Sequence, residues 1–132
     1  MQKKNARMLL PLFLSLLAAG CTTIPKPDLT RPLPAHVVRI SEEYANINTD
    51  IHKKTLKAYG IEQQAQFFVT FKEQKFRALL GEGYGDVERG DWIALIEEDD
   101  TLQLAISFGN AATEIGCSIG DTLYIERIGP GE

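Results

Sequence analysis

The stretch Gln66-Phe67-Phe68-Val69-Thr70-Phe71 predicts a β-strand, because its second, fourth and sixth residues are apolar. Successive side chains of a strand point to opposite faces, so these three apolar side chains share one face. Residues 72–75 are typical of a turn, and Phe76, Ala78 and Leu80 then alternate again in a return strand. We therefore expect a β-hairpin here, with the rest of the domain built around it.

Further strands are predicted on both sides of the hairpin. Residues 36–40 indicate a first strand before it. After it, the continuously apolar Trp92–Ile96 predicts a strand buried on both faces, and the charged residues 97–100 predict a turn. Apolar residues at period two predict another strand over 102–106, and residues 123–128 predict a last one after a turn at 120–121.

Two short helices are also expected. Asn48 or Thr49 can cap a helix in which the apolar residues after position 50 fall at helical spacing, and Gly60 can close it in the left-handed conformation. Asn110 can cap a second helix over Ala111–Ile115, closed by Gly116. About six short strands with two short helices predict a mostly β fold, either a small barrel or a sandwich.

The N-terminus has the three parts of an export signal. Three basic residues within the first seven precede the apolar residues 8–17, and small residues lead to Cys21. A run of roughly 10 apolar residues is shorter than the roughly 20 of a membrane-spanning helix. We expect residues 1–20 to be a cleaved signal peptide. Cleavage of an ordinary secreted protein near a chance cysteine is the alternative.

Leu17-Ala18-Ala19-Gly20-Cys21 resembles the lipobox of bacterial lipoproteins. This resemblance implies that Cys21 becomes an acylated N-terminus that anchors the chain to a membrane. Thr22 follows where an aspartate would retain a lipoprotein in the inner membrane. We therefore expect a location in the cell envelope, on the outer membrane facing the periplasm.

A proline-rich spacer is expected between lipid and domain, over residues 21–35, because four of its residues are proline. Residues 36–132 then suffice for one domain. Without the signal peptide, 11 basic side chains stand against 18 acidic ones, a net charge near −7. Such a charge opposes binding to nucleic acid. Cys117 is the only other cysteine, and we expect a small apolar residue rather than a reactive thiol or an intermolecular bridge.

The sequence contains no recognisable catalytic or metal-binding set. His36 and His52 are the only histidines, and neither has a carboxylate or thiol at ligand spacing, so no metal and no cofactor are expected. The acidic residues 97–100 lack the pattern of a calcium loop. The glycine-rich residues 81–85 lack the dinucleotide fingerprint, and no helix is expected after them. Neither Ser107 nor Ser118 has a histidine at a spacing typical of a catalytic serine, which argues against an enzyme.

Four ordered stretches resemble the S-adenosylmethionine hydroxide adenosyltransferase and halogenase (chlorinase-fluorinase) family. Tyr44-Ala45-Asn46-Ile47-Asn48-Thr49-Asp50-Ile51 is similar to the Phe-Gly-Asn-x-x-Thr-Asn-Ile that opens the family's C-terminal domain. Residues 56–61 resemble its Leu-x-x-Leu-Gly-Ile, and residues 84–96 its Tyr-x-Asp-Val-x-x-Gly-Glu with the following strand. Leu102-Gln103-Leu104-Ala105-Ile106-Ser107-Phe108-Gly109-Asn110-Ala111-Ala112 is similar to its Leu-Glu-Ile-Ala-x-Asn-x-Gly-x-Ala-Ala, continued over residues 115–123.

The resemblance implies a free-standing C-terminal β-barrel domain, which in complete enzymes closes over the adenosyl group of S-adenosylmethionine. It further implies that the catalytic residues belong to an N-terminal domain that this chain lacks. Asn46 matches an asparagine near the adenine. Tyr44 matches the phenylalanine of the same segment, and its ring could stack on a base or pack in the barrel. Ser107, Phe108 and Gly109 match the loop that borders the adenine pocket, and residues 98–101 match a turn that faces the ligand in many members.

We therefore expect a non-catalytic, membrane-anchored barrel that binds a small, nucleoside-like ligand or an envelope protein. The candidate site is the mouth of the barrel, lined by Tyr44, Asn46, Phe108 and Asn110. The alternative is a scaffolding lipoprotein that acts through protein contacts or forms a homo-oligomer. Exposed aromatic residues around Phe68, Tyr84 and Tyr124 would favour that alternative. An enzyme would need catalytic residues from another chain.

Overall fold

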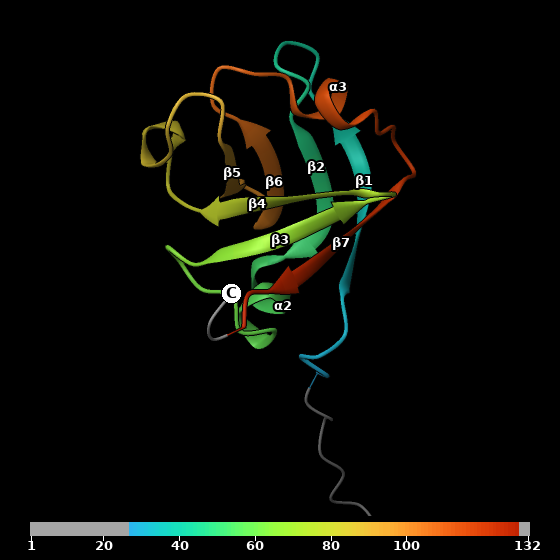
Figure 1. Ribbon diagram of the computed structural model, residues 1–132, viewed down its shortest axis with the longest axis vertical. Helices are drawn as coiled ribbons and strands as arrows, with labels where there is room; N and C mark the ends of the chain where they lie inside the picture. Colours follow the sequence, from blue (N-terminus) through green and yellow to red (C-terminus); the bar gives the residue numbers. More distant parts are fainter. Residues whose placement is uncertain (1–26, 130–132) are drawn as a thin grey trace, which may run out of the picture.

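Seven strands close into a barrel in the computed structural model, which describes residues 27–129 (Figure 1). The strands pair around the barrel in the order β1-β2-β6-β5-β4-β3-β7, and β7 pairs with β1 to close it. Only the β4–β5 pair is parallel. The strands are β1 (Leu33–Ile40), β2 (Ile47–His52), β3 (Gln66–Phe71), β4 (Gln74–Leu80), β5 (Trp92–Ile96), β6 (Thr101–Ile106) and β7 (Thr122–Arg127). The predicted mostly β barrel is confirmed.

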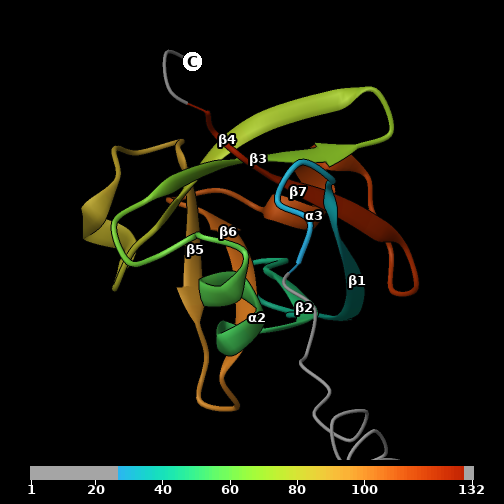
Figure 2. The same cartoon turned by 90° about the horizontal axis from the view of Figure 1, so that it is seen from below.

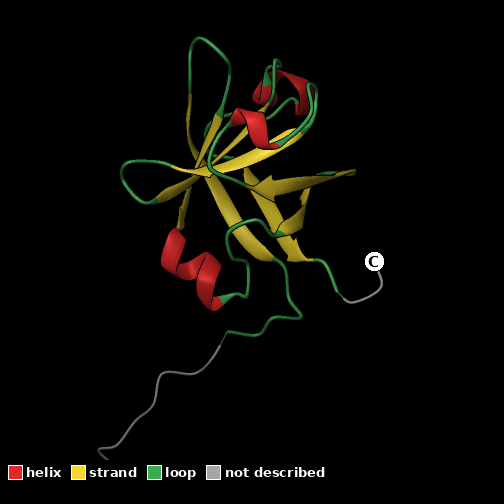
Figure 3. Ribbon diagram, turned by 90° about the vertical axis from the view of Figure 1, so that its left-hand side faces the viewer, coloured by secondary structure: helices red, strands yellow, loops and turns green. Residues whose placement is uncertain are grey.

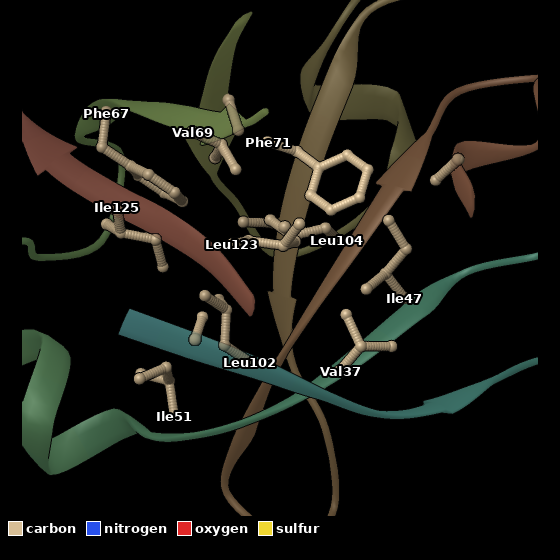
Figure 4. Packing of buried hydrophobic residues seen from close by; sticks show 14 of the residues in the cluster. Val37, Ile47, Ile51, Phe67, Val69, Phe71, Leu102, Leu104, Leu123 and Ile125 are labelled. Carbon is tan, nitrogen blue, oxygen red and sulfur yellow. The ribbon is translucent and has the colours of Figure 1, made fainter. Parts of the chain in front are cut away.

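The hairpin that decides the fold class is formed by β3 and β4 as predicted. Phe67 lies opposite Ala78, and Val69 lies opposite Phe76. Phe67, Val69 and Phe71 are buried and point into the barrel, toward side chains of β6 and β7 (Figure 4). Each large apolar side chain buried in this way contributes about 1.5–3 kcal/mol.

Two short helices cover opposite ends of the barrel (Figure 3). Helix α2 (Lys53–Ala58) buries Leu56 at one end, which Figure 2 views from below. Helix α3 (Ala111–Ile115) buries three of its five residues at the other end. The side-chain amide of Gln74, at the tip of the hairpin, donates a 2.8 Å hydrogen bond to the carbonyl of Ile115. The prediction for α3 is confirmed, including Gly116 in the left-handed conformation.

The predicted start of the first helix is wrong. Asn48 and Thr49 do not cap a helix but lie within β2. The polar residues Asn48 and Asp50 alternate with the buried Ile47 and Ile51, and this period of two outweighs the helical spacing that continues into α2. The helix instead starts at Lys53, where the ring of His52 accepts a hydrogen bond from the backbone N–H of Lys54.

The end of α2 follows the prediction. Gly60 has a φ of +85°, in the left-handed region. The backbone N–H groups of Gly60 and Ile61 donate to the carbonyls of Lys57 and Leu56, at 3.0 and 2.9 Å. This pair of hydrogen bonds satisfies carbonyls that the helix end would otherwise leave unpaired.

Strand β1 starts at Leu33, three residues before the predicted start at position 36. Leu33, Pro34 and Ala35 pair with β7, and Ala35 is fully buried. The last part of the expected spacer therefore belongs to the barrel. The expected signal peptide, Cys21 and the first part of the spacer lie outside the described residues.

Strand β5 is buried on both faces at Ile93 and Ala94, whereas its ends are half-buried. Ile93 lies between Leu79 of β4 and Ala105 of β6. The residues after β4 cover this outer surface, since a Cβ atom added to Gly81 would approach Ile93 Cδ1 to 2.8 Å.

Within residues 27–129, the structure has no helix of the length and apolar character needed to cross a membrane.

We predict that the Asp50→Asn variant loses stability at neutral pH but not at acidic pH. Partial burial of Asp50 opposes its ionisation, but hydrogen bonds from the backbone N–H of His36 (2.9 Å) and its ring (2.8 Å) outweigh burial and lower the carboxyl pKa. Because the carboxyl pKa is lower in the folded state than its unfolded value of about 3.9, Asp50 stabilises the folded state fully at pH values above that unfolded value. This contribution disappears as the pH falls through the folded-state pKa. Both side chains are about half exposed, so we expect a loss below about 1 kcal/mol.

Urea unfolding of wild type and variant at pH 7 and below pH 3 measures this difference. Asp91→Asn serves as the control, because the Asp91 side chain makes no hydrogen bond or ion pair with any described residue. An equal loss at both pH values would contradict the assignment.

Candidate functional site

A pocket with a volume of about 610 Å³ lies at the end of the barrel that carries α3. All six candidate residues from the sequence meet in it, although they come from segments more than 60 positions apart. Three further residues complete the wall. The lining consists of Glu43, Tyr44, Asn46, Tyr84, Ile106, Ser107, Phe108, Gly109 and Asn110.

The loop between β1 and β2 carries Tyr44 and Asn46. Two backbone hydrogen bonds between Ser41 and the end of the loop close it: Ser41 N–H donates to the Asn46 carbonyl, and Ala45 N–H to the Ser41 carbonyl, both at 3.0 Å. The Asn46 N–H donates to Ser41 Oγ at 2.9 Å. A further bond from Ala112 N–H to the Ala45 carbonyl (2.9 Å) joins the loop to α3. The loop is therefore held in place from both sides.

Asn46 is a buried polar residue of the pocket wall, with only 6% of its surface exposed. Its amide nitrogen donates to Tyr84 Oη at 2.9 Å and to Gln103 Oε1 at 3.2 Å. Its amide oxygen, Oδ1, is buried without a hydrogen-bond partner. A buried unpaired acceptor destabilises a protein by about 1–3 kcal/mol, so such an atom calls for an explanation.

The segment after β6 supplies the other wall. Ser107 is buried, and its backbone is clamped because its N–H donates to the Asp91 carbonyl (2.9 Å) and its carbonyl accepts from Gly90 N–H (2.8 Å). Gly109 follows in a tight turn, where an added Cβ would lie 2.6 Å from Ile106 Cγ2. Asn110 stands at the cap position of α3 as predicted, but its side chain makes no capping hydrogen bond.

Phe108 is the most exposed of the large apolar residues, with 79% of its surface accessible. Its φ is +60°, a conformation that L residues with a side chain rarely adopt. The Arg89 guanidinium lies over the ring, 4.5 Å from its centroid. Strained backbone of this kind is typical of binding and catalytic sites.

Tyr84 reaches the pocket from the glycine-rich segment. The sequence suggested no helix here, but Tyr84–Asp86 forms one turn of 3-10 helix, η2. Asp86 Oδ2 accepts hydrogen bonds from the N–H groups of Glu82 (2.7 Å) and Gly83 (3.4 Å). The turn thus satisfies these donors with its own carboxylate, and an anion cannot use them while it stays in place.

The acidic turn over residues 97–100 does not face this pocket. The turn precedes β6, and the pocket lies at the other end of that strand. The five residue steps from Thr101 to Ile106 span about 17 Å. Asp100 instead forms an ion pair with Lys53 of α2, with a distance of 3.2 Å from Nζ to Oδ1. Residues 98–101, which match a turn that faces the ligand in many family members, are not among the residues that line this pocket. The one carboxylate in the lining is Glu43, whose hydrogen bond and negative charge raise the pKa of Tyr44.

The three aromatic residues expected to form a protein-contact patch do not share one surface, because Tyr84 lies apart from Phe68 and Tyr124. Tyr84 lines the pocket, while Phe68 and Tyr124 lie on β3 and β7, on the opposite side of the barrel from β6. Lys75 and Arg77 place their cations over the Phe68 ring, at 4.3 and 5.2 Å from its centroid.

The remaining candidates for chemistry are engaged elsewhere. His36 pairs with Asp50, and His52 caps α2. No group of three His, Cys, Asp or Glu residues within the described part of the chain could hold a metal ion. Cys117 is buried, and burial raises the pKa of its thiol, which agrees with a small apolar residue rather than a reactive one.

Residues 35–124 match the SAM hydroxide adenosyltransferase C-terminal domain family, as the sequence resemblance implied. An uncharacterized conserved protein from Thermotoga maritima is similar in structure, with 19% identity and a TM-score of 0.66 over 80% of this chain and 42% of that one. A conserved hypothetical protein from Thermus thermophilus has 18% identity and a TM-score of 0.50, over 81% of this chain and 40% of that one. This chain spans about two fifths of their lengths, and the likeness shows the fold alone. No curated protein matches it.

We predict that Phe108→Gly is more stable than Phe108→Ala by about 1 kcal/mol. Both variants remove the ring and its contact with Arg89, but only glycine adopts the observed positive φ without a steric penalty. Thermal or urea unfolding of the two variants gives the difference directly. Equal stabilities would show that residue 108 is not held in a strained conformation in solution.

Proposed function

Because the chain belongs to the SAM hydroxide adenosyltransferase C-terminal domain family, we propose that its barrel is a ligand-binding module that performs no chemistry of its own. The proposed ligand is a small nucleoside-like molecule, and the proposed site is the pocket beside α3. The match covers the family's C-terminal domain alone, over residues 35–124.

The unpaired Oδ1 of Asn46 is the observation that carries this proposal. An N–H group of a ligand would pair with this acceptor and remove the cost of leaving it unsatisfied. Oδ1 has no contact with solvent in the ligand-free structure, so a ligand donor would reach it only after a neighbouring side chain of the pocket wall moves. The amino group on a nucleobase has this chemistry and a planar shape that permits close packing.

The aromatic side chains at the pocket support a planar ligand. Tyr44, Tyr84 and Phe108 are 56, 42 and 79% exposed, and all three line the same cavity. Stacking of a base on an aromatic ring contributes about 1–3 kcal/mol. A cavity of about 610 Å³ also lies in the usual range for small-molecule sites.

The composition of the lining supports a role without catalysis. It contains no histidine, cysteine, lysine or aspartate, and Ser107 has no base among the lining residues other than the Glu43 carboxylate, which interacts with Tyr44. General acid–base chemistry requires such groups within hydrogen-bond reach of the reacting atoms. Binding and release of an unchanged ligand do not.

We further propose that the chain is a lipoprotein, anchored through Cys21 to the outer membrane and facing the periplasm. This proposal rests on the N-terminal sequence. The described chain enters the barrel at the end near α2, whereas the pocket lies at the end near α3 (Figure 1). In an anchored protein with this entry point, the pocket would open away from the membrane.

A scaffolding role remains the second proposal, and the exposure of Phe108 and Tyr44 favours it. Aromatic residues are enriched where proteins make specific contacts. A partner protein would then occupy the same pocket rim, or two copies of this chain would associate through it.

We predict that adenosine, at about 100 times its dissociation constant, raises the free energy of unfolding of the full chain by about 2.7 kcal/mol. Thermal melting in detergent, with a titration of adenosine and other purine nucleosides, measures this effect. Asn46→Ala should abolish the shift, because it removes the acceptor. The scaffolding role becomes the better proposal if no purine nucleoside stabilises the protein.

The aromatic part of the site has a matched control. Tyr84 and Tyr124 are almost equally exposed, at 42 and 44%, but only Tyr84 lines the pocket. Tyr84→Ala should weaken adenosine binding at least tenfold, and Tyr124→Ala should leave it unchanged.

We predict that Cys21→Ser abolishes lipid attachment and removes the protein from the outer membrane. Serine cannot form the thioether to diacylglycerol, so neither lipid attachment nor the following cleavage takes place. Radiolabelled palmitate and membrane fractionation in a bacterial host with an outer membrane measure both effects. Palmitate labelling of the serine variant would place the lipid on another residue.

A further inference from the structure

The orientation of the Asn46 amide is set from outside the pocket. We propose that Glu97, acting through Gln103, positions this amide so that the pocket offers a hydrogen-bond acceptor and selects ligands that present a donor. This inference rests on the proposed function, since it names the chemistry by which the same pocket would distinguish between ligands. Glu97 and Gln103 do not line the pocket and act as positioning residues.

A chain of side-chain hydrogen bonds runs along the outer surface of β2 and β6. Gln103 Nε2 donates to Glu97 Oε1 at 2.9 Å and to Asn48 Oδ1 at 3.3 Å. Gln103 Oε1 then accepts from Asn46 Nδ2 at 3.2 Å, and the same nitrogen donates to Tyr84 Oη at 2.9 Å. Gln103 is 6% exposed and Asn48 is 4% exposed, so water has little access to the middle of this series of hydrogen bonds.

The carboxylate of Glu97 determines which amide atoms donate and which accept in this series of hydrogen bonds. An ionised carboxylate can only accept hydrogen bonds, whereas an amide can face its neighbour with either its NH₂ or its oxygen. Glu97 therefore requires the NH₂ of Gln103, which turns Gln103 Oε1 toward Asn46. That oxygen requires the NH₂ of Asn46, and Asn46 Oδ1 is the atom left unpaired.

The reversed arrangement can be satisfied everywhere except at Glu97, because Asn48 can also turn its amide and donate its NH₂ to Gln103 Oε1 in place of the present 3.3 Å hydrogen bond. Tyr84 can donate its hydroxyl to Asn46 Oδ1, and Gln103 can donate its NH₂ to the same oxygen. Gln103 Oε1 would then face the Glu97 carboxylate at hydrogen-bond distance, and two acceptors without a proton between them repel each other. Glu97 is thus the element that breaks the symmetry of the amides.

The consequence is selectivity between ligands of equal size. Adenosine carries an amino group at the position where inosine carries a carbonyl oxygen. A buried acceptor on the protein pairs with the first and repels the second. Sites built around such hydrogen bonds reject the mismatched ligand strongly, because a buried polar group stays unpaired. We expect wild-type protein to prefer adenosine to inosine at least tenfold.

Replacement of Glu97 by glutamine tests the inference. The glutamine amide can donate to Gln103 Oε1 or accept from its NH₂, so both directions of the chain become accessible. The ratio of the adenosine and inosine dissociation constants, measured by calorimetry on the full chain in detergent, should fall toward one in Glu97→Gln. Glu98→Gln makes the same chemical change at the next position, whose side chain is not a hydrogen-bond partner of Asn46, Asn48 or Gln103, and should keep the wild-type ratio.

A ligand-free measurement separates this inference from the proposed function. In NMR spectra of the wild type, the Asn46 NH₂ protons should show nuclear Overhauser effects to the Tyr84 ring, since Asn46 Nδ2 lies 2.9 Å from Tyr84 Oη. Glu97→Gln should weaken these effects and Glu98→Gln should not. If no nucleoside binds, the proposed function fails while the NMR result still decides the orientation. Unchanged Overhauser effects, or an unchanged affinity ratio, in Glu97→Gln would overturn the inference.

Discussion

The pairing of β7 with β1 is the interaction on which the rest of the structure depends. It joins the two ends of the domain and leaves no free strand edge in the described barrel. Once the sheet is closed, every second side chain must point into a small interior, which explains the fully buried Phe67, Leu104 and Ile125. The interior is filled with side chains, so a ligand site has to be built at an end of the barrel, from loops.

Closure also determines what the outer surface can carry. On the face of β2 and β6 that points away from the core, the amides Asn48 and Gln103 are almost completely buried. Asn46, Asn48 and Gln103 therefore bond to one another instead of to solvent. The strand pair is therefore apolar toward the core and carries a series of side-chain hydrogen bonds on its other face. This series ends at the pocket.

Much of this structure could be predicted from local patterns. The β3–β4 hairpin, α3 and the left-handed Gly116 follow from period-two alternation and from capping residues, which are properties of neighbouring residues. The helix expected at Asn48 was wrong because the segment changes from a period of two to helical spacing within a few residues. The start of β1 was missed because Pro34 conceals a strand whose pairing partner, β7, lies at the far end of the sequence.

The candidate site, like the fold, could be predicted from the sequence only in part. Tyr44, Asn46 and residues 107–110 were identified through the family resemblance, and the structure brings them to one cavity. Tyr84 was assigned to a different surface, because only the three-dimensional fold reveals that the glycine-rich turn lies against Ile93 of β5 and brings Tyr84 to Asn46. No sequence pattern could indicate the connection from Glu97 through Gln103, since it depends on which side-chain atoms face each other.

The clamp on Ser107 and the positive φ of Phe108 have a kinetic consequence. The rim of the pocket takes up its strained shape during folding, held by the hydrogen bonds to Gly90 and Asp91. An arriving molecule would not need to order this rim, so its capture rate would be governed by diffusion and orientation. Differences in affinity among similar molecules would then be expressed as differences in residence time.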